Sequence, residues 1–75
     1  MFQTDHTTLI LAHRARARAL ETWREAAELV STRWEVFLQT ERESRPWAFA
    51  SYVAALDAEE AAAAEMAQIA TSVAA

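Results

Sequence analysis

Residues 41–47, with the sequence Glu-Arg-Glu-Ser-Arg-Pro-Trp, contain the only proline of a 75-residue chain that has no glycine. Proline lacks a backbone N–H and disfavours helix at the residue before it, but it fits the first turn of a new helix. The segment from Arg42 to Arg45 also lacks the apolar positions that one continuous helical stripe would need. We therefore predict that one helix ends here and another begins, rather than a single helix kinked at Pro46.

The two segments on either side of this stretch contain no helix breaker, which predicts two long helices. We expect the first over about 5–43, a bend at 44–46 and the second helix over about 46–72. In both segments apolar residues recur every three or four positions, as in amphipathic helices. The sequence thus predicts an all-α fold, an antiparallel two-helix hairpin in which residues 1–75 form a single domain.

One apolar stripe on each helix is expected to face the other helix. The first stripe consists of Leu9, Ala12, Ala19, Leu20, Trp23, Ala27, Val30, Trp34, Phe37 and Leu38, and the second of Phe49, Tyr52, Val53, Leu56, Ala63, Met66, Ala70 and Val73. Folding back at residue 45 places Phe37 opposite Val53 and Trp34 opposite Leu56. In this register the first helix overhangs the second by about a third of its length.

A hairpin of this size cannot enclose a core, because each helix has only one partner to cover its stripe. Such short chains usually need disulfides, a metal or self-association, and the absence of cysteine excludes disulfides and thiolate metal sites. We therefore expect a homodimer in which two hairpins form a four-helix bundle. The residues expected to serve self-association or partner binding are Leu9, Leu11, Arg16, Leu20, Trp23, Leu29, Val36, Glu59, Met66 and Val73.

Two groups of apolar residues lie off the main stripes. Leu11, Leu29 and Val36 are about half a turn away from the first stripe, and they could form a second contact face for another protein. Trp47 directly follows the bend and has two interpretations. It could pack against the end of the first helix and close the hairpin, or it could be an exposed anchor for a partner.

Charged residues within the stripes suggest pairing between chains, because an unpaired charge in a core is costly. Glu59 and Glu60 lie in and beside the second stripe, and Arg16 lies in the first, too far away to meet them within one hairpin. We predict that Arg16 pairs with Glu59 or Glu60 of an antiparallel second chain. A metal site that combines His6 and His13 with these glutamates is a second alternative function. The two histidines share a helix face, but neither has a partner at the Glu-x-x-His spacing that is typical of metal-binding bundles.

The net charge of −4 combines an arginine-rich first helix with an acidic second one, and the chain contains no lysine. A first alternative function is therefore nucleic-acid binding through Arg14, Arg18 and Arg24. The acidic balance of the chain and the scatter of Arg14, Arg16 and Arg18 around the helix argue against this function. Arginine without lysine, beside abundant alanine, indicates a GC-rich coding sequence, such as that of a high-GC bacterium or its phage.

No motif of an enzyme is present. Without glycine there is no P-loop, nucleophile elbow or dinucleotide-binding turn, and no serine has a neighbouring histidine. We expect no cofactor and no catalysis.

No run of apolar residues approaches membrane-spanning length and no signal peptide is evident, which predicts a cytoplasmic protein without membrane contact. The leading prediction is a non-enzymatic protein–protein interaction module that acts through an apolar, tryptophan-containing helical surface. A small regulator, an adaptor or a phage-encoded assembly or host-inhibitory factor would fit.

Overall fold

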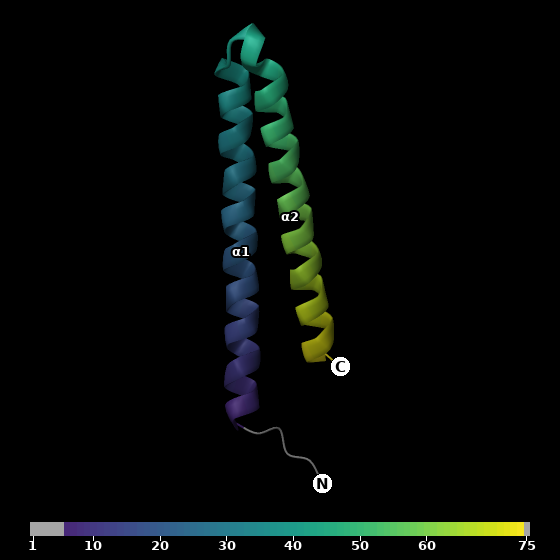
Figure 1. The fold of residues 1–75 in the computed structure, drawn as a ribbon. Coiled ribbons are helices and arrows are strands. Elements are labelled where there is room, and N and C mark those ends of the chain that lie inside the picture. Colours follow the sequence, from purple (N-terminus) through teal and green to yellow (C-terminus); the bar gives the residue numbers. More distant parts are fainter. Residues whose placement is uncertain (1–5, 75) are drawn as a thin grey trace.

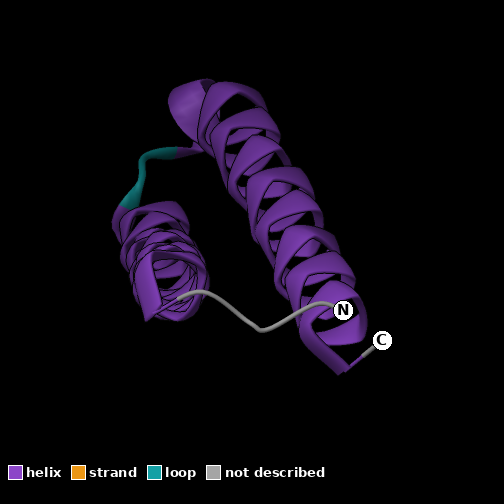
Figure 2. Cartoon of the chain, turned by 90° about the horizontal axis from the view of Figure 1, so that it is seen from below, coloured by secondary structure: helices purple, strands orange, loops and turns teal. Residues whose placement is uncertain are grey.

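The computed structural model describes residues 6–74, and their side chains as far as residue 71. Helix α1 spans His6–Gln39, a single-turn 3-10 helix η1 spans Arg42–Ser44, and helix α2 spans Arg45–Ala74. The two long helices run antiparallel and are joined by one short connection (Figures 1 and 2). The Cα atoms span 65 × 15 × 12 Å, so the chain is a thin rod. The predicted all-helical hairpin is confirmed for residues 6–74.

The end of α1 lies four residues before the predicted one near residue 43. The N–H of Thr40 donates to the carbonyl of Phe37 at 3.3 Å, which is a 3-10 rather than an α-helical hydrogen bond. The hydroxyl of Thr40 donates to the carbonyl of Val36. A threonine side chain that bonds the backbone locally competes with helix continuation. The helix therefore ends at Gln39, although the residues after it are compatible with helix.

The bend is built without any left-handed residue, since no residue from 6 to 74 has positive φ. Glu41 is extended, with φ −63° and ψ 151°, and the N–H of Ser44 donates to its carbonyl at 2.9 Å. Helix α2 then begins at Arg45, which is α-helical with φ −58° and ψ −41° although proline follows it. Pro46 lies in the first turn of α2, as predicted, where a missing N–H leaves no helical bond unmade.

We expect Pro46→Ala to change the free energy of unfolding by less than about 1 kcal/mol, because the first-turn N–H groups have no helical partner. Ala50→Pro, at an exposed position one turn later, should cost about 3 kcal/mol because it breaks an interior bond. Thermal unfolding followed by circular dichroism checks both variants. A large loss with Pro46→Ala would show that the proline ring, rather than the hydrogen bonds around η1, holds the bend.

Alanines form the contact between the two helices. The fully buried residues among those described are Ala19 on α1 and Ala48, Ala55 and Ala62 on α2; we call them the alanine seam. The three on α2 are seven residues apart, which is close to two helical turns, so they lie in one row. Half-buried Ala12 and Ala26 lie seven residues on either side of Ala19. Small side chains in these rows allow the helix backbones to approach closely.

The prediction for the inner face of α2 was therefore partly wrong. Tyr52, Leu56 and Met66 are half-buried, but the remaining predicted residues with described side chains are exposed, namely Phe49, Val53, Ala63 and Ala70. The helix is rotated so that its row of alanines is buried against α1, while Phe49 and Tyr52 contact α1 through their rings and stay partly exposed. Close backbone approach explains this choice, because larger side chains in the same row would hold the helices apart.

The predicted register was also wrong, by about one helical turn. The ring of Trp34 contacts that of Tyr52, four residues before the predicted Leu56, and the ring of Phe37 contacts that of Phe49, four residues before the predicted Val53. The shift follows from the position of the bend, which lies four residues earlier than expected. Helix α1 has 34 residues and α2 has 30, so α1 extends only a short way past α2 (Figure 1). The expected overhang of a third of α1 does not occur.

Candidate protein interaction site

Four aromatic rings, two from each helix, form a continuous cluster next to the bend. The ring of Trp34 lies 5.3 Å from that of Phe37 on α1 and 5.0 Å from that of Tyr52 on α2. The ring of Phe49 lies 5.7 Å from that of Phe37 and 6.2 Å from that of Tyr52. These centroid distances are typical of favourable aromatic pairs. The cluster joins the helices, since each ring contacts one ring on its own helix and one on the other.

The cluster is open to solvent on its outer side. Trp34 is 40% exposed and Phe49 is 50% exposed, despite their ring contacts. Leu38 and Val53, each one turn further along its helix, extend this surface and are 57% and 36% exposed. Residues four apart lie on the same side of a helix, so the apolar surface is continuous. We call it the aromatic face, and its members are Trp34, Phe37, Leu38, Phe49, Tyr52 and Val53.

A contiguous exposed apolar surface is typical of sites that contact another protein, a membrane or a ligand. It contains no charged side chain, and its only polar side-chain groups are the indole N–H of Trp34 and the hydroxyl of Tyr52. Aromatic residues are the side chains most often found at the energetically important centre of protein interfaces. The arrangement can therefore bind another apolar surface.

Trp47 lies on a different side of α2 from the aromatic face. It is 65% exposed and makes no ring contact with another described residue. Phe49 follows it by two positions, and residues two apart point to different sides of a helix. Trp47 thus does not close the hairpin against α1. Its role as an anchor for a partner remains a prediction.

The other predicted contact residues are divided between exposed and half-buried positions. Leu9, Leu11, Arg16, Leu29 and Val36 are exposed, whereas Leu20, Trp23, Glu59 and Met66 are half-buried. The side chain of Val73 lies outside those that the structure describes. Trp23 makes no ring contact with the aromatic cluster, and the part that these residues play in self-association remains a prediction.

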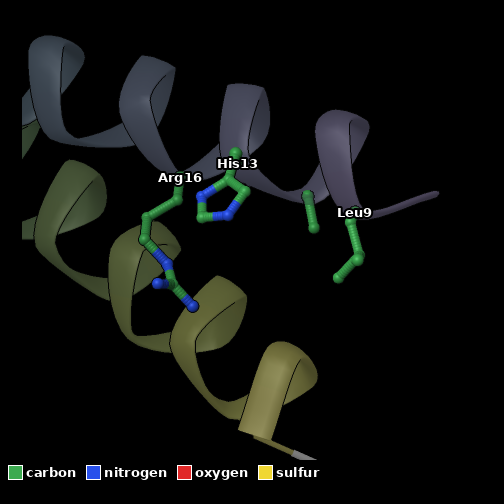
Figure 3. Close-up of a pocket in the computed structure, with 4 residues that line it drawn as sticks. Leu9, His13 and Arg16 are labelled. Carbon is green, nitrogen blue, oxygen red and sulfur yellow. The ribbon is translucent and has the colours of Figure 1, made fainter. Parts of the chain in front are cut away.

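A hollow of about 80 Å³ lies at the open end of the hairpin, lined by Leu9, Ala12, His13 and Arg16 (Figure 3). All four residues come from α1, and Figure 3 shows the side chain of Arg16 reaching toward α2. The hollow has room for only a few water molecules. Its lining contains no acid that could complete a catalytic or metal site.

The metal-binding alternative gains no support from the positions of its residues. The register places Glu59 and Glu60 near the middle of the rod, whereas His6 and His13 lie toward its open end. Among residues 6–74 no group of three or more histidine or acidic side chains could hold a metal ion. The two histidines and two glutamates are therefore not gathered into one site within a hairpin.

The arginines of the nucleic-acid alternative are exposed but do not form one surface. Arg14 and Arg18 are four positions apart and lie on the same side of α1. Arg16 between them points to another side, and so does Arg24, six positions after Arg18. Arg24 lies more than a turn further along. A phosphate backbone would meet only part of this charge at a time.

Comparison with known proteins gives no relative from which a function could be transferred: no family model, no curated protein and no solved structure matches the chain. In the part of the chain that the structure describes, neither helix has a stretch apolar and long enough to cross a bilayer. The aromatic face must therefore be interpreted from its own chemistry.

Reasoning from sequence did not identify the aromatic face as an interaction surface. It assigned all six members, Trp34 included, to the contact inside the hairpin, and so omitted them from the candidate interaction residues. The rings of Phe37, Phe49 and Tyr52 do contact the other helix, but the exposed side of the cluster was not predicted. The missed signal is the seven-residue spacing of Ala48, Ala55 and Ala62. This row would have identified the side of α2 that faces α1, and hence the side left free.

Proposed function

We propose that this protein is a non-enzymatic protein–protein interaction module that works as a homodimer, with two hairpins packed into a four-helix bundle. The observation that carries the proposal is the large surface of the single chain. The hairpin exposes 6130 Å², whereas a compact protein of 8.4 kDa exposes about 4,600 Å². The excess of about 1,500 Å² exceeds the roughly 800 Å² per partner that a stable interface hides.

The small interior supports the same proposal. Among the side chains that the structure describes, the buried ones are all alanines, and each buried methyl group contributes only about 0.8 kcal/mol. Ordering the chain costs about 1.5 kcal/mol per residue. Covering Trp34, Leu38 and Phe49 with a second copy would bury large apolar side chains, each worth about 1.5–3 kcal/mol when fully buried. Dimerisation through the aromatic face therefore supplies stability that the hairpin lacks.

We expect folding and association to be coupled. Sedimentation equilibrium at several concentrations should show a dimer, and the melting temperature should rise with protein concentration because the dimer binds only folded chains. Circular dichroism melts over a ~100-fold concentration range check this. A monomer that melts cooperatively at one temperature over the whole range would contradict the proposed homodimer.

The dimer would leave a second surface for another protein, which is why we propose a small cytoplasmic regulator or adaptor rather than a purely structural dimer. Trp47, Leu29 and Val36 are exposed, lie away from the aromatic face, and would remain so in the bundle. Affinity capture from the source cells with wild-type protein and with Trp47→Ala tests this surface. Proteins retained by the wild type alone would support the proposal, and identical sets of retained proteins would contradict it.

A further inference from the structure

A short band of charge follows the aromatic face on the side away from the bend. Arg24 lies fourteen residues before Leu38, and Glu60 lies seven residues after Val53. These are multiples of seven, so each charged residue is on the same side of its helix as the apolar one. Both Arg24 and Glu60 are exposed. The face presented by the hairpin is therefore apolar near the bend and charged at the middle of the rod.

Arg24 and Glu60 lie at nearly the same height on the two helices. The contact of Trp34 with Tyr52 fixes the register, and in this register Arg24 is level with residue 62. Glu60 is two residues from that level, which is about 3 Å along the axis. One edge of the band is thus positive and the other edge negative.

Resting on the homodimer proposed above, we infer that the two hairpins pack aromatic face to aromatic face with both bends at the same end of the bundle. A two-fold axis along the rod then places α1 of one protomer opposite α2 of its partner. Residues at equal heights meet, so Arg24 of each protomer pairs with Glu60 of the other. The partner that fits this surface is therefore a second copy of the same chain.

Hydrophobic matching favours this orientation. With the bends together, the charge-free half of each face covers the charge-free half of the other. With the bends at opposite ends, the aromatic face would instead cover the far half of its partner. His13 is an exposed residue of that half, and burying its imidazole under aromatic rings would remove its hydration without a compensating polar partner.

Charge complementarity favours the same orientation. A two-fold axis across the rod would place α1 opposite α1 and α2 opposite α2. If the two hairpins overlap over their full length in this arrangement, Arg24 of one protomer lies near Arg24 of its partner, and Glu60 lies near the partner's Glu60. Like charges brought together at an interface are unfavourable, and opposite charges fix orientation more than they raise affinity. The interchain pair of Arg16 with Glu59 or Glu60 expected from the sequence requires the bends at opposite ends, and so it does not form in this dimer.

A distance between spin labels tests the orientation. The chain has no cysteine, so Ser44→Cys places one label in η1 of each protomer. Bends at the same end predict a distance below about 35 Å, because neighbouring helices in a bundle lie 8–10 Å apart. Bends at opposite ends predict more than about 50 Å, since α1 itself is about 50 Å long. Glu43→Cys should give the same result and guards against a local effect of one label.

Charge reversal tests the ion pair itself. Arg24→Glu and Glu60→Arg should each weaken the dimer about 10-fold, and the double variant should recover most of the affinity because the pair forms again with its signs exchanged. Glu65→Arg, an exposed acid of the same helix outside the face, is the matched control and should leave the affinity unchanged. A double variant as weak as the single ones would overturn the pair.

The outcomes separate the inference from the proposed function. A dimer with labels more than about 50 Å apart would contradict the inferred orientation, in which both bends lie at the same end, but it would not contradict the homodimer. A chain that remains monomeric at every concentration would instead contradict the homodimer itself. Short distances together with recovery in the double variant support the arrangement.

Discussion

Replacing Trp34 with alanine should weaken the dimer by about 100- to 1,000-fold, the loss expected for an aromatic residue at the centre of an interface. Trp34 is the ring that joins α1 to Tyr52 of α2, and it remains 40% exposed in the hairpin. Much of its apolar surface can therefore be covered only by a second molecule. Sedimentation equilibrium of the variant and the wild type, at matched concentrations, gives the change in dissociation constant.

Trp47→Ala is the matched control, because it removes the same side chain from an even more exposed position outside the aromatic face. We expect its dissociation constant to stay within about twofold of the wild-type value, as for most residues outside an interface centre. Circular dichroism at high concentration, where both variants are associated, verifies that each is still helical. Equal weakening by the two substitutions would show that the aromatic face is not the dimer contact.

Ala55→Leu should lower the free energy of unfolding by about 1–3 kcal/mol, the usual cost of forcing extra methylene groups into a closely packed contact. Ala55 lies in the middle of the alanine seam and is only 3% exposed. The longer side chain would have to push α2 away from α1 and would loosen the aromatic cluster as well. Urea unfolding at one fixed protein concentration measures the difference.

Ala54→Leu provides the comparison for this variant, since Ala54 is the neighbouring residue of the same helix and is exposed. Leucine at an exposed helical position should change the free energy of unfolding by less than about 0.5 kcal/mol. If both leucines destabilised the protein equally, the close approach of the helices along the alanine seam would not be the cause.

Much of the fold could be predicted from local features. The absence of glycine, the single Pro46 and the steps of three and four between apolar residues are sufficient for two helices and one bend. The end of α1 was not predictable in the same way, because Thr40 and Glu41 are compatible with helix. It ends where the backbone and side chain of Thr40 bond to the last turn.

The candidate site was harder to predict, because it depends on which side of α2 turns inward. A large apolar residue such as Phe49 suggests burial by its own chemistry, yet it is half exposed. Ala48 beside it is buried instead. The difference between Trp34 in the aromatic face and Trp47 outside it likewise follows from the rotation of one helix and the position of the other.

The amino-acid sequence alone therefore accounts for the helices, the hairpin and the small hydrophobic core of a single chain. Helix propensity, proline and the spacing of apolar residues all act over a few neighbouring residues. Only the packed pair of helices fixes the register and rotation of α2, and with them the aromatic face. These depend on how closely two backbones can approach, and the rows of alanine allow the closest approach. The large apolar side chains are consequently left on the outside, where a second copy can cover them.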